Sequence, residues 1–226
     1  MNITLQQLNK ISPAIVGVRG QNIANAINKV SPMYKGMEDR LVVAATISNL
    51  IHESGEFTRF VENLNYSVRA LTKLFSRNRI TLNQCYQYGR IDGKQPANQQ
   101  AIANTIYGGN WGRLNLGNTQ QGDGWAFRGS GGLQATGRKT ITLFTTHYNR
   151  LMKTSHTLTD IVYMLRDKAN IAMTMHFTCW FITEFKGIAY LAKNGRFKDF
   201  CISINGGLNG YTDRLRYYNR AISVIK

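Results

Sequence analysis

The stretch DRLVVAATISNLIHE, residues 39–53, carries the pattern that fixes the fold class of this chain. Val43, Ile47 and Leu50 recur at helical spacing and form one apolar stripe. The pattern predicts a helix whose last residue is Glu53, because Ser and Gly follow it and favour a turn.

Helical periodicity also dominates the rest of the sequence. Alternation typical of β-strands is confined to short pieces near residues 57–64, and glycine- and asparagine-rich loops separate the helical segments. Without a repeat or a Pro-rich linker, the sequence predicts a mostly α fold in a single domain, residues 1–226. The other predicted helices are a short amphipathic one with Leu5, Leu8 and Ile11 on one face, and those over residues 97–107, 159–185 and 212–225.

The net charge is extreme for a globular protein. The chain has 28 Lys and Arg residues against 12 Asp and Glu residues, a formal charge of +16. Such a balance indicates a polyanionic partner: nucleic acid, an anionic membrane or an anionic cell-surface polymer. The basic residues are spread from Lys10 to Lys226 and form no separate arm, which argues against a sequence-reading DNA-binding protein.

The cysteines and the apolar segments bear on the compartment. Cys85, Cys179 and Cys201 are odd in number and lack metal-site spacing, so we expect buried thiols and neither a zinc site nor a disulfide framework. The start of the chain is polar and shows no secretory signal. Residues 171–185 are the most apolar, but they fall short of a membrane span and predict a buried core helix.

The strip FRGSGGLQATGRK, residues 127–139, comes close to a phosphate-binding loop but does not match one. Arg138 stands where that loop requires lysine, and no apolar β-branched run precedes the glycines. The strip therefore needs another explanation than nucleotide binding.

Two carboxyl groups are candidates for acid/base chemistry. Glu53 shares a helical stripe with Asn49 and meets the negative end of the helix dipole, which suits a general acid. Glu62 lies in a polar segment near Arg59, Asn63 and Asn65, an environment expected to keep it ionised. A pair of carboxyl groups in such different environments is what glycoside hydrolysis requires.

The other residues near these glutamates have simpler interpretations. Glu56 is expected at the surface and is, with Asp123, the fallback for the base. His52 is interpreted as a satisfied core histidine. Trp111 and Trp125 would be core residues by default, although sugar sites also use such rings for stacking.

Four segments taken together resemble the family-19 glycoside hydrolases. They are HESGEF, ENLNYS, DGWAFRGSGGLQATGR, and INGGLNG followed by YTDR, in this order over about residues 50–215. The chain is most similar to the chitinase-like endolysins with which phages lyse Gram-negative hosts. The resemblance implies a lysozyme-like helical fold with a deep cleft between two lobes. It also implies inverting hydrolysis of a β-1,4 bond to an amino sugar.

The resemblance assigns roles by position. Glu53 would be the general acid, Glu62 the base that activates water, and Thr136 the hydroxyl that holds that water. The base assignment depends on the ENLNY context, because plant members carry their second glutamate much further along the chain. The strip 127–139 becomes a cleft wall. Expected substrate-binding residues are Gln134, Asn205, Tyr66, Trp125 and Arg128.

The arginines of the strip have two expected uses. Arg128 and Arg138 would form structural ion pairs or contact anionic muramyl groups. No cofactor and no metal are expected.

The leading functional hypothesis is a phage or prophage endolysin, active as a monomer. Its expected partner is peptidoglycan, with contact to outer-membrane lipopolysaccharide, and no nucleic acid. The protein would stay in the host cytoplasm until a separate pore former released it to the periplasm. The alternatives are a chitinase, which the charge disfavours because chitin is uncharged, and a basic nucleic-acid-binding protein, which lacks a recognisable motif.

Overall fold

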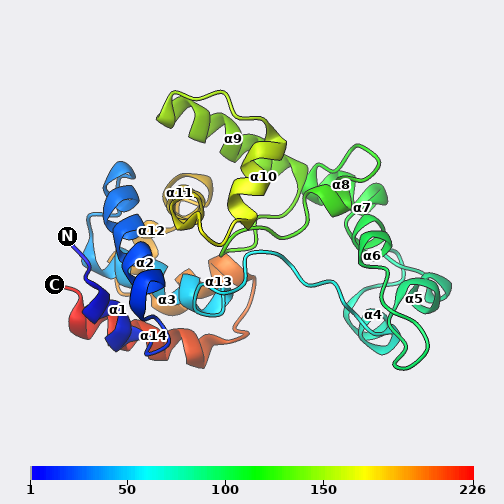
Figure 1. Ribbon diagram of the computed structural model, residues 1–226, viewed down its shortest axis with the longest axis horizontal. Helices are drawn as coiled ribbons and strands as arrows, with labels where there is room; N and C mark the ends of the chain where they lie inside the picture. Colours follow the sequence, from blue (N-terminus) through cyan, green and yellow to red (C-terminus); the bar gives the residue numbers. More distant parts are fainter. Residues whose placement is uncertain (1) are drawn as a thin grey trace. The chain divides into compact units, whose positions relative to one another are not determined.

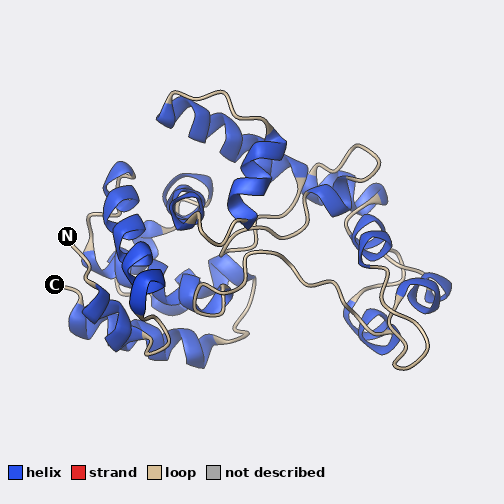
Figure 2. Cartoon of the chain, in the orientation of Figure 1, coloured by secondary structure: helices blue, strands red, loops and turns tan. Residues whose placement is uncertain are grey.

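The structure, a computed structural model, describes residues 2–226 and consists of helices joined by loops (Figure 2). Among these residues, β structure is limited to isolated bridges, and the predicted strand near residues 57–64 is reduced to the bridge between Val61 and Ser130. The mostly α fold is thereby confirmed. The helices are α1 (Leu5–Ile11), α2 (Gly17–Val30), η1 (Ser31–Met33), α3 (Arg40–Glu53), α4 (Val68–Leu74), α5 (Leu82–Tyr88), α6 (Gln99–Ile106), α7 (Gly109–Leu116), α8 (Asp123–Ala126), α9 (Arg138–Met152), α10 (Leu158–Arg166), α11 (Ile171–Trp180), η2 (Phe181–Phe185), α12 (Ala189–Lys193), α13 (Phe197–Asn205) and α14 (Tyr211–Val224).

Helix α3 is the helix predicted over residues 39–53. Asp39 caps it by accepting hydrogen bonds from the amides of Leu41 and Val42, and the helix ends at Glu53 as predicted. The predicted stripe of Val43, Ile47 and Leu50 is buried, and the burial extends beyond it, because every residue from Val42 to Ile51 is buried. A helix buried on all sides needs partners on all sides, and α11, α12, α13 and α14 all contact it.

The chain divides into two compact units. The first contains the N-terminal residues up to Phe60, Gly131–Leu133 and Met164–Lys226. In it α1 and α3 pack on α14, so that the two ends of the chain lie side by side (Figure 1). The glycines at 131 and 132 fit tightly here, since a Cβ on Gly132 would lie 2.4 Å from Leu50 Cδ1.

The second unit contains Val61–Ser130 and Gln134–Tyr163. Contacts of α4 with α5 and of α6 with α8 build it. Its core is a compact apolar cluster of Leu64, Leu71, Ile80, Cys85, Ile102, Ala103 and Ile106. The three cysteines of the chain are free and buried, as predicted.

Two of the predicted segments are divided differently in the structure. The region 159–185 is not one helix: it contains α10, α11 and η2, and Asn170 starts α11 anew by capping the amide of Met173. The glycine-rich region from Gly108 to Gly124, expected as one of the loops between helices, contains α7 and the start of α8. Helix α11 is buried along its length, which confirms a core helix in this region.

No helix within residues 2–226 combines the length and the apolar character that crossing a bilayer demands.

Candidate functional site

Glu53 is held at the end of α3 by an arginine from the last helix. Arg214 donates from Nη2 to Glu53 Oε1, and from Nη1 to Asn49 Oδ1 at 2.7 Å. Asn49 and Glu53 lie one turn apart on the same face of α3, so a single guanidinium reaches both. The Arg214 side chain is only 2% exposed and that of Glu53 is 22% exposed. The carboxyl group therefore faces a buried cation on one side and solvent on the other.

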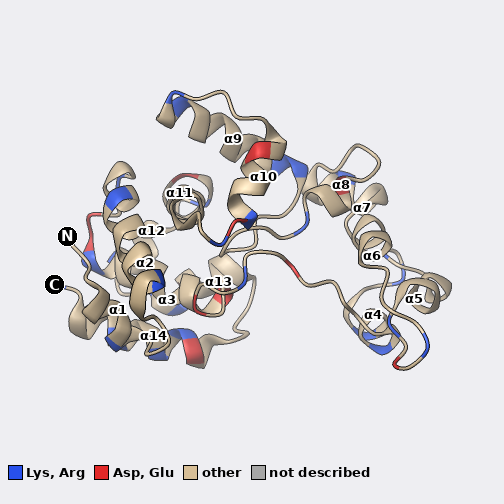
Figure 3. Cartoon of the chain, viewed as in Figure 1, with Lys and Arg blue, Asp and Glu red and all other residues tan. Residues whose placement is uncertain are grey.

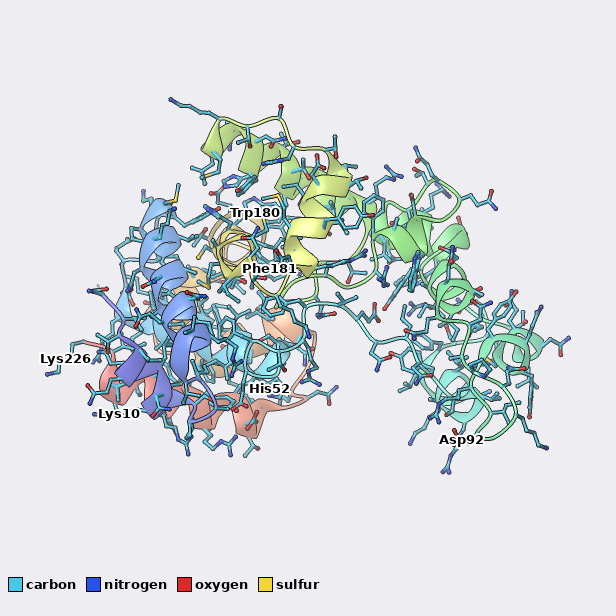
Figure 4. The ribbon with its side chains drawn as sticks, in the orientation of Figure 1. Lys10, His52, Asp92, Trp180, Phe181 and Lys226 are labelled. Carbon is cyan, nitrogen blue, oxygen red and sulfur yellow. The ribbon has the colours of Figure 1, made fainter. Side chains whose placement is uncertain are left out.

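His52 fastens the start of α14 to the end of α3 (Figure 4). Its Nδ1 lies 2.7 Å from Asp213 Oδ2. The turn before α14 touches the same ring, because a Cβ on Gly210 would lie 2.2 Å from His52 Nε2. The histidine is satisfied, as predicted, but it is half-buried and not a core residue.

Asn205 lies in the same unit as Glu53. It is the last residue of α13, it is exposed, and its Nδ2 donates to the carbonyl of Asn209 at 3.3 Å. The loop 206–210 leads from Asn205 to Gly210, which lies against the ring of His52. Because His52 directly precedes Glu53, this short loop connects the predicted sugar-binding amide to the neighbour of the predicted acid.

Glu56 is not the surface residue that the sequence predicted. It is half-buried, and its Oε1 accepts hydrogen bonds from Ser12 and from Tyr217, the latter at 3.1 Å. Its backbone has φ of 58°, a left-handed conformation that a side chain rarely adopts. These contacts tie Glu56 to α14 and to the turn after α1, so it is a poor fallback for the base.

Glu62 is clamped by two neutral donors. Tyr107 donates its hydroxyl to Oε1 at 2.6 Å, and the Gly129 amide donates to Oε2 at 3.0 Å. The Glu62 amide also donates to the Gly129 carbonyl at 3.0 Å. Of the neighbours that the sequence suggests, Asn63 accepts instead from the amide of Asn65 at 3.0 Å.

The negative charge of Glu62 affects the groups around it. Burial and then this charge raise the pKa of Tyr66, and the same two causes raise the pKa of Tyr107 well above its ordinary value. Burial lowers the pKa of Arg79 and of Arg128, and Glu62 opposes that effect. Both phenols therefore remain hydrogen-bond donors at any working pH.

Gln134 and Thr136 lie on the strip that turns back on itself after Ser130. The amides of Ser130 and Ala135 bond to each other's carbonyls at 3.0 and 2.7 Å. Thr136 is half-buried and donates its hydroxyl to the carbonyl of Gln134 at 2.8 Å, which leaves the oxygen free to accept. Gln134 reaches Gly129, where a Cβ would lie 2.5 Å from its Oε1 and 3.3 Å from Glu62 Oε2. Because Gly129 has no side chain, the side chains of Gln134 and Glu62 can both approach its backbone.

Trp125 and Arg128 form a stacked pair. The guanidinium carbon of Arg128 lies 3.5 Å from the indole centroid, and Nη1 donates to the Trp125 carbonyl at 2.7 Å. Trp125 is half-buried, so the core interpretation is only partly correct. Arg128 covers one face of the ring, and the indole also packs against the apolar cluster of the second unit.

Asp123 is occupied by a structural ion pair. Arg138 approaches it with two nitrogens, at 2.8 Å for Nε to Oδ2 and 2.6 Å for Nη2 to Oδ1. Burial alone would raise the pKa of Asp123, but the hydrogen bonds from Arg138 and from the amides of Gln120 and Thr119 hold it below its usual range. The expected ion pair of Arg138 is confirmed, and Asp123 is not available as a base.

Sequence reasoning missed Arg214, Tyr107 and Gly129. Arg214 stands on one helical stripe with Tyr218 and Ala221, where a charged residue signals a buried partner. Tyr107 and Gly129 carried no signal of their own. Among residues 2–226, His, Cys, Asp and Glu form no group of three or more that could hold a metal ion.

The sequence of the chain can be compared with known proteins. No protein-family model matches it. It is 30% identical over 224 residues to a glycosyl hydrolase family 19 domain-containing protein of Haemophilus influenzae, and this match covers 99% of the chain and 97% of the relative. With this identity over the whole length of both proteins, the chain belongs to glycosyl hydrolase family 19.

Proposed function

We propose that the protein is a phage or prophage endolysin that hydrolyses β-1,4 glycosidic bonds of peptidoglycan. Membership of family 19 implies a glycoside hydrolase for polysaccharides that contain N-acetylglucosamine. The observation that carries the proposal is that each of the two glutamates is held by donors of its own. Arg214 pairs with Glu53 and can stabilise the carboxylate left after proton donation, whereas a phenol and a backbone amide fix Glu62.

In this proposal Glu53 donates a proton to the glycosidic oxygen as the bond to the anomeric carbon breaks. Arg214 then stabilises the carboxylate that remains. Glu62 accepts a proton from the water that attacks the opposite face of the anomeric carbon, and the product has inverted configuration. The oxygen of Thr136 accepts a hydrogen bond from that water. Gln134 and Asn205 bind the amide and hydroxyl groups of the sugars.

The charge of the chain supports peptidoglycan over chitin. Lysine and arginine are distributed over both units (Figure 3), and the formal charge is +16. An anionic envelope polymer attracts such a surface, while chitin carries no charge. Contact with lipopolysaccharide would follow from the same attraction. A separate pore former would give the enzyme access to the wall.

The test uses purified peptidoglycan and neutral N-acetylglucosamine oligosaccharides as substrates. Glu53→Gln and Glu62→Gln should each lose about 10²-fold or more in kcat, because each removes a proton-transfer group, and the exposed control Glu38→Gln should be fully active. NMR of the first product should show the inverted anomer. A fully active Glu62→Gln enzyme, or retained configuration, would refute the mechanism.

Mass spectrometry of the digest identifies the bond. A reducing end on muramic acid indicates a muramidase, and one on glucosamine indicates a glucosaminidase. A 1,6-anhydro end would mean a lytic transglycosylase and would contradict hydrolysis. Faster cleavage of chitin oligomers than of peptidoglycan would favour the chitinase alternative.

A further inference from the structure

The carboxylate of Glu62 has one fixed donor on each oxygen. Tyr107 Oη reaches Oε1 at 2.6 Å, and the Gly129 amide reaches Oε2 at 3.0 Å. Two donors on opposite oxygens set the rotation of the carboxylate plane, which a free glutamate side chain would not keep. Of the two donors, only the Tyr107 hydroxyl is part of a side chain, so only this donor can be removed by a substitution.

Tyr107 is itself held in place from several directions. It is the C-cap residue of α6, and its carbonyl accepts from Asn118 Nδ2 at 2.8 Å. The carbonyl of Ile106 before it accepts from Arg79 Nε and Nη2 at 3.0 and 2.8 Å. The Arg79 guanidinium in turn stacks 3.7 Å from the centroid of the Trp111 ring. These bonds fix the backbone from which the Tyr107 side chain reaches Glu62.

Asn118 connects this anchor to the strip that carries Thr136. The Asn118 side chain is buried, and its Oδ1 accepts from the amide of Arg138 at 2.8 Å. The amide lies two residues beyond Thr136. One buried amide side chain thus fixes both the tyrosine behind Glu62 and the end of the strip 127–139.

We infer that Tyr107 is a positioning residue for Glu62, which orients the carboxylate so that a free lone pair of the base faces the attacking water. The inference depends on the proposed role of Glu62 as the base. The phenol suits this task because burial and the neighbouring negative charge raise its pKa, so that it stays a donor. Misplacing a catalytic group by about 1 Å can cost about 10²-fold in rate.

The first experiment is Tyr107→Phe, which deletes one oxygen and keeps the ring. We expect kcat on peptidoglycan to fall about 10- to 100-fold, the effect of one hydrogen bond to a charged group, with KM changed by less than about twofold. Tyr88→Phe is the matched control, because Tyr88 packs against the same core cluster and should keep wild-type kcat. Unchanged kcat in a folded Tyr107→Phe enzyme would overturn the inference.

The second experiment separates positioning from a general structural role. Tyr107→Phe is combined with Glu62→Gln, and residual rates are measured with a fluorogenic N-acetylglucosamine oligosaccharide, alongside melting temperatures. If Tyr107 acts through Glu62, the double variant should be no slower than Glu62→Gln alone. Equal losses in both backgrounds would overturn the inference and leave the proposed function intact. Wild-type activity of Glu62→Gln would instead refute the proposed base.

Discussion

Removing the carboxylate of Glu53 should destabilise the first unit by an amount that depends on what is left to pair Arg214. The Arg214 side chain is 2% exposed, and breaking a buried ion pair from one side costs about 3–5 kcal/mol. Glu53→Ala leaves the guanidinium with Asn49 alone. Because Glu53 is partly solvated, we expect the lower limit, about 3 kcal/mol, which is a fall of about 6–12 °C in Tm for a chain of this size.

Glu53→Gln should be much milder, because the amide oxygen still accepts from Arg214. We expect about 1 kcal/mol and about 2–4 °C. Activity, in contrast, should be equally low in the two variants. Both should lose at least about 10²-fold in kcat, since neither can donate the proton. The melting temperature should therefore depend on whether alanine or glutamine replaces Glu53, whereas kcat should not.

Calorimetric melting of both variants and of Glu38→Ala, an exposed carboxylate, measures the effect. Glu38→Ala should melt close to the wild type. If Glu53→Ala melted at the wild-type temperature, or above Glu53→Gln, the stability of the folded protein would not depend on the ion pair between Arg214 and Glu53, and the reasoning would be refuted.

Four further outcomes are expected. Thr136→Ser should keep most of kcat and Thr136→Val should lose it, because the hydroxyl holds the water; an active Val variant and an inactive Ser variant, both folded, would reduce the strip to a wall. Since the pKa of Asp123 is depressed in the folded protein, its contribution is present above about pH 4 and lost as pH falls through the folded value, so Asp123→Asn should lower Tm at pH 7 and converge with the wild type in acid. Activity on whole envelopes should fall steeply between about 0.1 and 1 M salt, as the Debye length shrinks from about 10 to about 3 Å, while cleavage of a neutral oligosaccharide should barely respond; equal sensitivity would place the effect in the chemistry. In a crystal structure with bound oligosaccharide, the carboxyl groups of Glu53 and Glu62 should lie about 6.5–9.5 Å apart, and about 5 Å would indicate a retaining enzyme.

The helices that the sequence predicted well are those with a clear stripe or cap. Residues 39–53 and 212–225 match α3 and α14 closely, and 97–107 matches α6, which Asn98 caps. Helix α9 was missed because its N-cap residue is Gly137, which has no side chain to cap the helix. The break before α11 was missed because the polar run 166–170 contains no proline or glycine, and Asn170 caps the new helix.

At the site, the sequence predicted the residue at which helix α3 ends, but not the residues that contact Glu53 and Glu62. Glu53 ends α3 as expected, but Arg214 is separated from it by 161 positions. Tyr107 and Gly129 are 45 and 67 positions from Glu62. Contacts of this kind are set by helix packing, which local periodicity does not contain. One catalytic domain over residues 1–226 stays a prediction, and so do the assigned roles of the site residues.

The discontinuity of the first unit matters during synthesis. The second unit is complete once the ribosome has added Tyr163, whereas α3 requires α14, which ends at Val224. At about 5–20 residues per second, the residues after Phe60 take roughly 10–30 s to appear. Throughout this time the buried helix α3 has no α14 to pack against, and Glu53 has no Arg214 to pair with. A ribosome that stops before α14 would therefore release a chain in which the second unit is complete and the first unit lacks one of its principal packing helices.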